Sequence, residues 1–177
     1  MIVDEAIDIV SKLLVIDAIT APKSVGRDDI VVDIVSDEKI KEKILSQMES
    51  ITDRGGKSFY KRDAINCRDV LHIILIGFKE FYHGFDCGFC GFSGCDECAK
   101  NGGICAVTAT DCGIAIGSLV KLASIFGVDN RIMISIGQAA VEMGYYKERY
   151  SFKVRGAYGI PLSATTKNPF FDRKIKV

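Results

Sequence analysis

The sequence Val70-Leu-His-Ile-Ile-Leu-Ile76 is almost entirely apolar and rich in β-branched residues. Runs of this kind are typical of strands that are buried on both faces of a sheet. We therefore predict a central strand here, and we expect the elements on either side of it in the sequence to cover its two faces. His72 lies inside this run and is interpreted as a core residue.

The segments before this strand alternate between helical and extended patterns. Val3, Ile7, Val10 and Leu14 recur at helical spacing, and a proline at position 22 stops the run. The elements predicted here are a helix beginning near residue 3, a strand over 29–35, a helix over 40–51 capped by Ser36 or Asp37, and a surface loop over 53–62.

The segments after the strand begin with a cysteine-rich stretch and then alternate again. The predicted elements are a helix over 106–127, a short strand over 131–136, a short helix over 138–143 and a last strand over 152–160. Gly113 and Gly117 share one helix face, which would allow a neighbouring element to approach closely. This order predicts an α+β fold with a single mixed sheet covered by helices. We expect one domain, 1–177, with a cysteine-rich metal-binding insertion at 84–106.

The overall composition narrows the function classes. The 177 residues carry no net charge, which argues against binding to nucleic acid or to an anionic membrane surface. The longest apolar stretch, 104–126, is interrupted by Asp111 and Lys121, so we expect a buried core helix rather than a membrane span. The acidic residues that follow Met1 do not resemble a targeting segment, and we expect a cytoplasmic protein.

The cysteines are concentrated in one short segment. Of seven cysteines, only Cys67 lies outside the segment 87–112. Secreted disulfide frameworks spread their cysteines along the chain, whereas clustered cysteines in a cytosolic protein indicate metal or redox chemistry. Glycines at 88, 91 and 94 would allow the tight backbone path that converging thiolates require.

Three interpretations of this segment compete. The first is an iron–sulfur cluster with four thiolate ligands, for which the simplest set is Cys87, Cys90, Cys95 and Cys105, with Cys98 as a substitute ligand. The second is zinc, although structural zinc sites usually separate their cysteine pairs by about 12–20 residues. The third is a redox dithiol of the Cys-x-x-Cys type, which needs one pair rather than five clustered thiols.

The segment reads Cys87-Gly-Phe-Cys90-Gly, then Cys95 with an acidic residue and Ala99, then Gly102-Gly103 and Cys105. This pattern resembles the short four-iron domain of corrinoid iron–sulfur proteins and of Rnf-type electron-transport subunits. The resemblance implies a single 4Fe-4S cluster.

Further blocks extend a resemblance over nearly the whole chain. They are Ala21-Pro22-Lys23-Ser24, Arg62-Asp63-Ala64, Asp111-Cys-Gly-Ile-Ala-Ile-Gly-Ser118, Asp129-Asn-Arg-Ile-Met-Ile-Ser-Ile-Gly137, and Gly159-Ile-Pro-Leu-Ser-Ala164 with Lys167-Asn-Pro-Phe-Phe-Asp-Arg173. They resemble a prokaryotic family described as containing a ferredoxin domain. The resemblance brings no assigned reaction. In that family an aliphatic residue is expected at position 112, so Cys112 is left out of the ligand set.

A second likeness concerns the fold. The segments 18–29, 109–127 and Tyr158-Gly-Ile-Pro161 resemble the early segment, the long core helix and the final strand of flavin-dependent nitroreductases. This resemblance implies a three-layer α/β sandwich, a homodimer and FMN at the dimer interface. The arginine-rich opening that those enzymes use for the FMN phosphate is missing, and Lys23, Arg27 or Arg173 would have to replace it.

These observations leave three functions. The leading one is a redox protein that transfers one electron at a time through its cluster, with donor and acceptor proteins that the sequence does not identify. The second is a nitroreductase-like oxidoreductase in which the cluster reduces a bound flavin. The third is a non-catalytic module in which zinc or an iron–sulfur cluster only stabilises the cysteine-rich loop.

Overall fold

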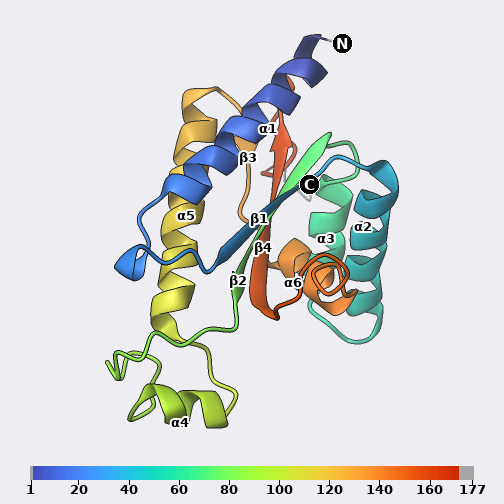
Figure 1. Ribbon diagram of the computed structural model, residues 1–177. Coiled ribbons are helices and arrows are strands. Elements are labelled where there is room, and N and C mark those ends of the chain that lie inside the picture. Colours follow the sequence, from blue (N-terminus) through green and yellow to red (C-terminus); the bar gives the residue numbers. More distant parts are fainter. Residues whose placement is uncertain (1, 172–177) are drawn as a thin grey trace.

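The computed structural model describes residues 2–171, which form three layers (Figure 1). A central sheet is covered on one face by two long helices, α1 (Ile2–Thr20) and α5 (Ala106–Ile125). The other face is covered by α2 (Glu38–Asp53), α3 (Phe59–Asn66) and α6 (Ile134–Glu142). A short 3-10 turn, η1 (Ser24–Gly26), joins α1 to the sheet.

The sheet contains four strands in the order β1-β2-β4-β3. Their bounds are β1 Ile30–Val35, β2 His72–Lys79, β3 Asp129–Asn130 and β4 Val154–Ser163. All neighbouring strands are antiparallel, so the α+β class is confirmed and the expectation of a mixed sheet is corrected. The helix α3 explains the difference. One helix between β1 and β2 would favour a parallel pair, whereas a second helix carries the chain back so that β2 runs the opposite way.

The predicted central strand is confirmed as β2. It pairs with β1 on one side and with β4 on the other. Ile73 and Leu75 lie in the core facing α2, α3 and α6, while Ile74 and Ile76 lie in the core facing α1 and α5. Side chains alternate across a strand, so a strand covered on both faces must be apolar throughout.

The helices with long apolar periodicity are confirmed as α1, α2 and α5. Asp37, one of the two proposed caps, accepts a hydrogen bond from the backbone N–H of Ile40 at 3.1 Å and so begins α2. By length and composition, α5 could cross a membrane. In this structure one of its faces is buried against the sheet. Gly113 and Gly117 face open space, so the expected close approach is not made by any described residue.

Several shorter elements differ from expectation. The predicted loop 53–62 contains the start of α3, and the predicted strand 131–136 contributes only a bridge between Met133 and Gly159 before α6 begins at Ile134. We attribute the early start of α6 to its close packing on β4. A Cβ at Gly137 would lie 1.9 Å from the carbonyl oxygen of Ala157, so the helix contacts the strand directly. The last strand continues through residue 161 to Ser163.

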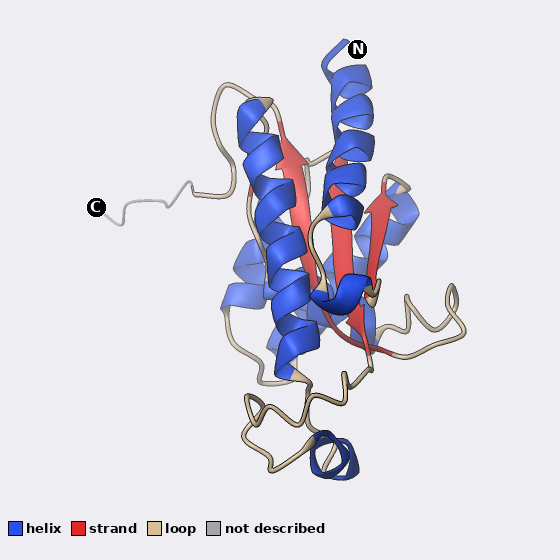
Figure 2. Ribbon diagram, turned by 60° about the vertical axis from the view of Figure 1, so that its left-hand side comes forward, coloured by secondary structure: helices blue, strands red, loops and turns tan. Residues whose placement is uncertain are grey.

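The cysteine-rich segment leaves the sheet after β2 and returns to the body at α5. It lies at one end of the molecule, beyond the sheet and the helices that cover it (Figure 2). Within it, the short helix expected near Cys95 is confirmed as α4 (Cys95–Lys100). The two apolar cores contain none of the five cysteines between 87 and 105.

Candidate metal centre

Five cysteines surround one cavity, here called the thiol cavity. The space between them is small, about 10 Å³. Its lining residues are Tyr82, Cys87, Gly88, Cys90, Gly94, Cys95, Cys98, Cys105 and Ala106. The structure therefore brings the four predicted ligands together, and it places Cys98 with them.

Tight turns make this convergence possible. Gly88 and Gly91 have φ values of 71° and 83°, in the left-handed region that favours glycine. Asp86 accepts a hydrogen bond from the backbone N–H of Cys95 at 2.7 Å and so holds the beginning of α4. A Cβ at Gly94 would lie 3.0 Å from the Asp86 carboxylate, so the absence of a side chain there leaves room for this contact.

The surroundings of Cys105 favour its thiolate form. Burial disfavours its ionisation, but the nearby backbone N–H groups of Thr108, His83 and Val107 outweigh burial and lower the pKa of Cys105. Cys105 is the N-cap residue of α5, next to the unpaired backbone N–H groups of the first helical turn. N–H groups near a ligand sulfur are among the interactions that tune iron–sulfur centres.

Cys98 has the opposite environment. Burial, a hydrogen bond with Cys90 and the nearby Cys105 and Cys95 thiols raise the pKa of Cys98 to about 11. Several thiolates cannot share so small a space without a cation between them. A positively charged metal core would remove that penalty, since coordination deprotonates a thiol outright.

A single zinc ion and an iron–sulfur cluster need different arrangements of their donors. Across residues 2–171, no three Cys, His, Asp or Glu side chains form a group that could hold a metal ion. A zinc site brings four donors to about 2.0–2.3 Å from one ion. A cluster holds its thiolates around a larger inorganic core. The thiol cavity is lined by five thiols, one more than the four donors of a tetrahedral zinc site.

Hydrogen bonds attach the segment to the body. The Tyr82 hydroxyl donates to the Gly103 carbonyl at 2.9 Å, and the Thr108 hydroxyl donates to the Phe81 carbonyl at 3.1 Å. The guanidinium of Arg155, on β4, donates to the Gly102 carbonyl. The sequence pattern did not indicate Tyr82, Asp86 or Arg155, because their roles depend on residues that are distant in the sequence or on loop geometry.

His83 lies beside this centre. Its side chain is almost fully buried, and Nε2 makes no hydrogen bond in the described chain. The nearest carboxylate oxygen, Oδ2 of Asp111, is 3.8 Å away. Asp111 in turn accepts hydrogen bonds from the backbone N–H and the hydroxyl of Ser24, each at 3.0 Å. Asp111 therefore lies between Ser24 of η1 and His83 in the segment that carries the thiols.

The residues suggested for a flavin phosphate lie outside the thiol cavity. Lys23 donates to carbonyl groups at the end of α1, and its Nζ is 3.9 Å from Asp28. Arg27 stacks on the Phe81 ring and pairs with Asp29. Arg173 lies outside the described residues. A phosphate role for these three side chains stays a prediction.

The two remaining cysteines lie in the cores. Cys67 follows α3 and contacts the sulfur of Met133 at 3.7 Å, and burial raises its pKa. Cys112 lies on α5 against the sheet, where burial raises the pKa of its thiol to about 12. Neither cysteine lines the thiol cavity.

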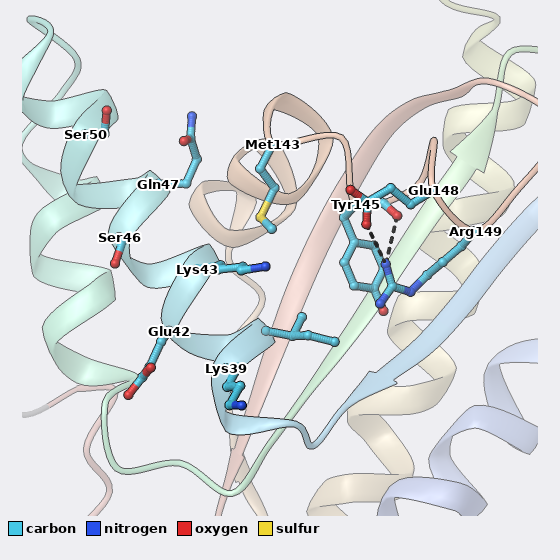
Figure 3. A pocket seen from close by; sticks show the side chains of 11 residues that line it. Lys39, Glu42, Lys43, Ser46, Gln47, Ser50, Met143, Tyr145, Glu148 and Arg149 are labelled. Carbon is cyan, nitrogen blue, oxygen red and sulfur yellow. Dashed lines mark hydrogen bonds and ion pairs between the residues drawn. The ribbon is translucent and has the colours of Figure 1, made fainter.

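A larger cavity, about 820 Å³, lies elsewhere, between α2 and the turn that follows α6 (Figure 3). It is an open groove lined by charges of both signs. Arg149 is held there by the Tyr145 carbonyl at 3.1 Å and by Glu148 at 3.9 Å. It shares no residue with the thiol cavity, so its size does not make it the chemical centre.

Comparisons with known proteins agree with this picture. An uncharacterised protein from Archaeoglobus fulgidus is 38% identical over 182 residues, which is 98% of this chain and 95% of that protein. The family model described as "Uncharacterized protein containing a ferredoxin domain" (DUF2148) matches residues 101–173. The matched part includes Cys105 and begins after Cys98.

The fold is similar to that of nitroreductases. A nitroreductase with bound FMN from Desulfitobacterium hafniense DCB-2 has a TM-score of 0.62 and 16% identity, covering 96% of this chain and 85% of that chain. A nitroreductase family protein from Clostridium novyi NT has a TM-score of 0.61 and 16% identity, covering 92% and 76%. At this identity the likeness shows the fold alone.

Proposed function

Because the chain belongs to the family of proteins that contain a ferredoxin domain (DUF2148), we propose that it transfers electrons one at a time through a single 4Fe-4S cluster. The proposed ligands are Cys87, Cys90, Cys95 and Cys105, with Cys98 able to replace one of them. When bound, the cluster supplies a site that accepts and releases one electron. The single observation that carries the proposal is the convergence of five thiols on one cavity.

The position of the cavity suits exchange of electrons with another protein. Cys87 is exposed, and Phe85 and Phe89 beside it are 47% and 80% exposed. Brief redox encounters use small interfaces, and a few exposed aromatic groups at such a site provide the apolar contact. Buried Cys98 and Cys105 would face the interior side of the cluster, where the backbone amides stabilise negative charge on sulfur.

The proposal is tested by iron, sulfide and flavin analysis of anaerobically purified protein, together with its absorption spectrum. About four irons and four sulfides per chain are expected for one cluster with four thiolate ligands. Cys87→Ser, Cys90→Ser, Cys95→Ser and Cys105→Ser are each expected to lose most of the iron. Cys67→Ser and Cys112→Ser are the matched controls, because both residues lie away from the cavity.

The alternative outcomes are separable. Full iron retention in Cys105→Ser would place Cys98 in the ligand set. One zinc per chain and no colour would leave a module whose metal only stabilises the loop, and electron transfer would be refuted.

A second candidate is a flavin-dependent oxidoreductase in which the cluster reduces bound FMN. The observation that favours it is the fold shared with a nitroreductase that binds FMN. The flavin would join one-electron delivery to two-electron chemistry. Lys23, Arg27 and Arg173 are the proposed phosphate ligands. Flavin recovered from the purified protein, and lost in Arg27→Ala, would support this function, whereas a flavin-free protein that does not bind added FMN would refute it.

A further inference from the structure

A second cavity, partly open to solvent, lies close to the thiol cavity and is here called the edge cavity. Its volume is about 410 Å³, within the range of small-molecule sites. It lies beside β4 over residues 154–158, where no described strand pairs with the outer edge of β4. Its lining residues are Phe78, Ile104, Ile134, Gln138, Val141, Glu142, Arg155, Gly156, Ala157 and Tyr158.

A narrow crevice, with no room for a water molecule, lies between the two spaces. Phe78, Ile104 and Arg155 line both the edge cavity and the crevice. Tyr82 and Cys105 line both the crevice and the thiol cavity. A molecule in the edge cavity is therefore separated from a cluster ligand by the crevice residues alone, and Ile104 is covalently adjacent to Cys105.

The walls favour a flat, uncharged ring. Most of the lining is apolar, and the Phe78 ring fills the place of a side chain at Gly156, where a Cβ would lie 2.7 Å from the ring. The ring edge therefore forms an apolar part of the wall. Arg155 and Glu142 are the two charged side chains in the lining, and their charges cancel. A phosphorylated ligand would need more positive charge than this wall provides.

The polar groups are donors held in place. The Gln138 side-chain carbonyl accepts from the Tyr60 hydroxyl, and its amide donates to Glu142 at 3.2 Å. An amide nitrogen carries two hydrogens, so one remains. The Nε of Arg155 is buried, and the nearest carboxylate is that of Glu80, 3.8 Å away in the wall of the crevice. The free N–H of Gln138 favours a ligand that carries a carbonyl oxygen.

We propose that the edge cavity binds a neutral, planar, conjugated dicarbonyl of the quinone class, which accepts electrons from the cluster. The redox part rests on the proposed function, and the binding part does not. Reduction of such a quinone to its hydroquinone takes two electrons and two protons, one proton for each carbonyl oxygen. The cluster delivers the electrons in two successive oxidations, a one-electron donor protein reduces it again, and water supplies the protons.

Binding is measured first by equilibrium dialysis against the purified protein, with 2,3-dimethyl-1,4-naphthoquinone as the probe, because its substituted ring positions do not add cysteine thiols. Saturable binding is expected. Ile134→Trp, at a 52% exposed wall residue, is expected to weaken it by at least about tenfold because the larger ring occupies the cavity. Ile132→Trp is the matched control, since Ile132 is 46% exposed and does not line the cavity. Gln138→Leu keeps the shape, removes the amide, and is also expected to weaken binding.

Electron transfer is then followed as reoxidation of the dithionite-reduced, desalted holoprotein. The rate is expected to saturate with naphthoquinone and to lose that saturation in Ile134→Trp, while reoxidation by ferricyanide is unchanged. Equal naphthoquinone binding in Ile134→Trp and the wild type, or a rate that only rises linearly, would overturn the proposal. A protein without iron would refute the proposed function, whereas dialysis would still decide whether the cavity binds the ring.

Discussion

His72 shows how a single polar residue is accommodated inside the central strand. Ser11 uses its hydroxyl hydrogen on the Asp8 carbonyl, so its oxygen accepts from Nδ1 of His72 at 3.0 Å. Burial is the main cause that lowers the pKa of His72 below its ordinary 6.5. The folded protein therefore binds fewer protons at this position than the unfolded chain, and stability falls as the pH drops below about 6.5.

We predict that the stability of His72→Gln depends less on pH than the stability of the wild type does. Urea unfolding at pH 7.5 and 5.5 gives the free energy of unfolding at each pH. The wild type is expected to lose more of it at pH 5.5 than the variant does. Ser11→Ala is a useful comparison, because it leaves the imidazole N–H without an acceptor and is expected to cost about 1–3 kcal/mol at pH 7.5. Equal losses in the wild type and His72→Gln would contradict this role.

Gly103 is the residue at which packing of the thiol segment is tightest. A Cβ there would lie 2.7 Å from the Cys98 sulfur and 2.7 Å from the Phe92 ring. Gly103→Ala is expected to displace Cys98 and to lower the iron content of the purified protein. Gly113→Ala on α5, where a Cβ meets nothing within 4 Å, is expected to retain its iron. Normal iron content in Gly103→Ala would show that the cluster does not depend on this packing.

At the scale of elements, α2 shows how much an N-cap residue contributes to the stability of the fold. Asp37→Ala removes the acceptor for the Ile40 N–H and is expected to lower the free energy of unfolding by about 1 kcal/mol. Ser36→Ala is the control, since Ser36 makes no such contact. Urea unfolding of the two variants measures the difference, and equal stability would mean that solvent replaces the cap without cost.

The elements also show what sequence patterns can and cannot reveal. β2 and the long helices were predicted because each carries its own continuous or periodic apolar pattern. The short helix α3 was missed because its burial depends on distant contacts, such as the hydrogen bond from Ser135 to the buried Asp63 at 2.7 Å. The candidate site follows the same rule. The cysteines are close together in the sequence and could be predicted from it, whereas Arg155 reaches the site from the distant strand β4 and could not.

At the scale of the whole molecule, one face is left uncovered by the described chain. Ile9 and Ile16 on α1 are 59% and 56% exposed and lie seven residues apart, beside α5 with its open Gly113 and Gly117 (Figure 2). We propose that a second copy of the chain covers this face, forming a homodimer. Exposed apolar surface of this extent on neighbouring helices is typical of an interface.

Analytical ultracentrifugation is expected to give twice the chain mass for the wild type. The double variant Ile9→Glu, Ile16→Glu is expected to sediment as a monomer, because the carboxylates would be buried without partners. Ile65→Glu is the control, since Ile65 is equally exposed but lies on α3, on the other side of the sheet. A monomeric wild type, or a dimer that persists in the double variant, would contradict the proposal.

The separation of the thiol cavity from both apolar cores has a consequence for biogenesis. None of the five cavity cysteines contributes to either core, and the segment is joined to the body by the contacts of Tyr82, Thr108 and Arg155. If the chain carries the proposed cluster, we therefore expect the scaffold to fold before iron and sulfide are supplied. Such a protein could be held as a folded reserve, and a cluster destroyed by oxygen could be rebuilt without synthesis of a new chain.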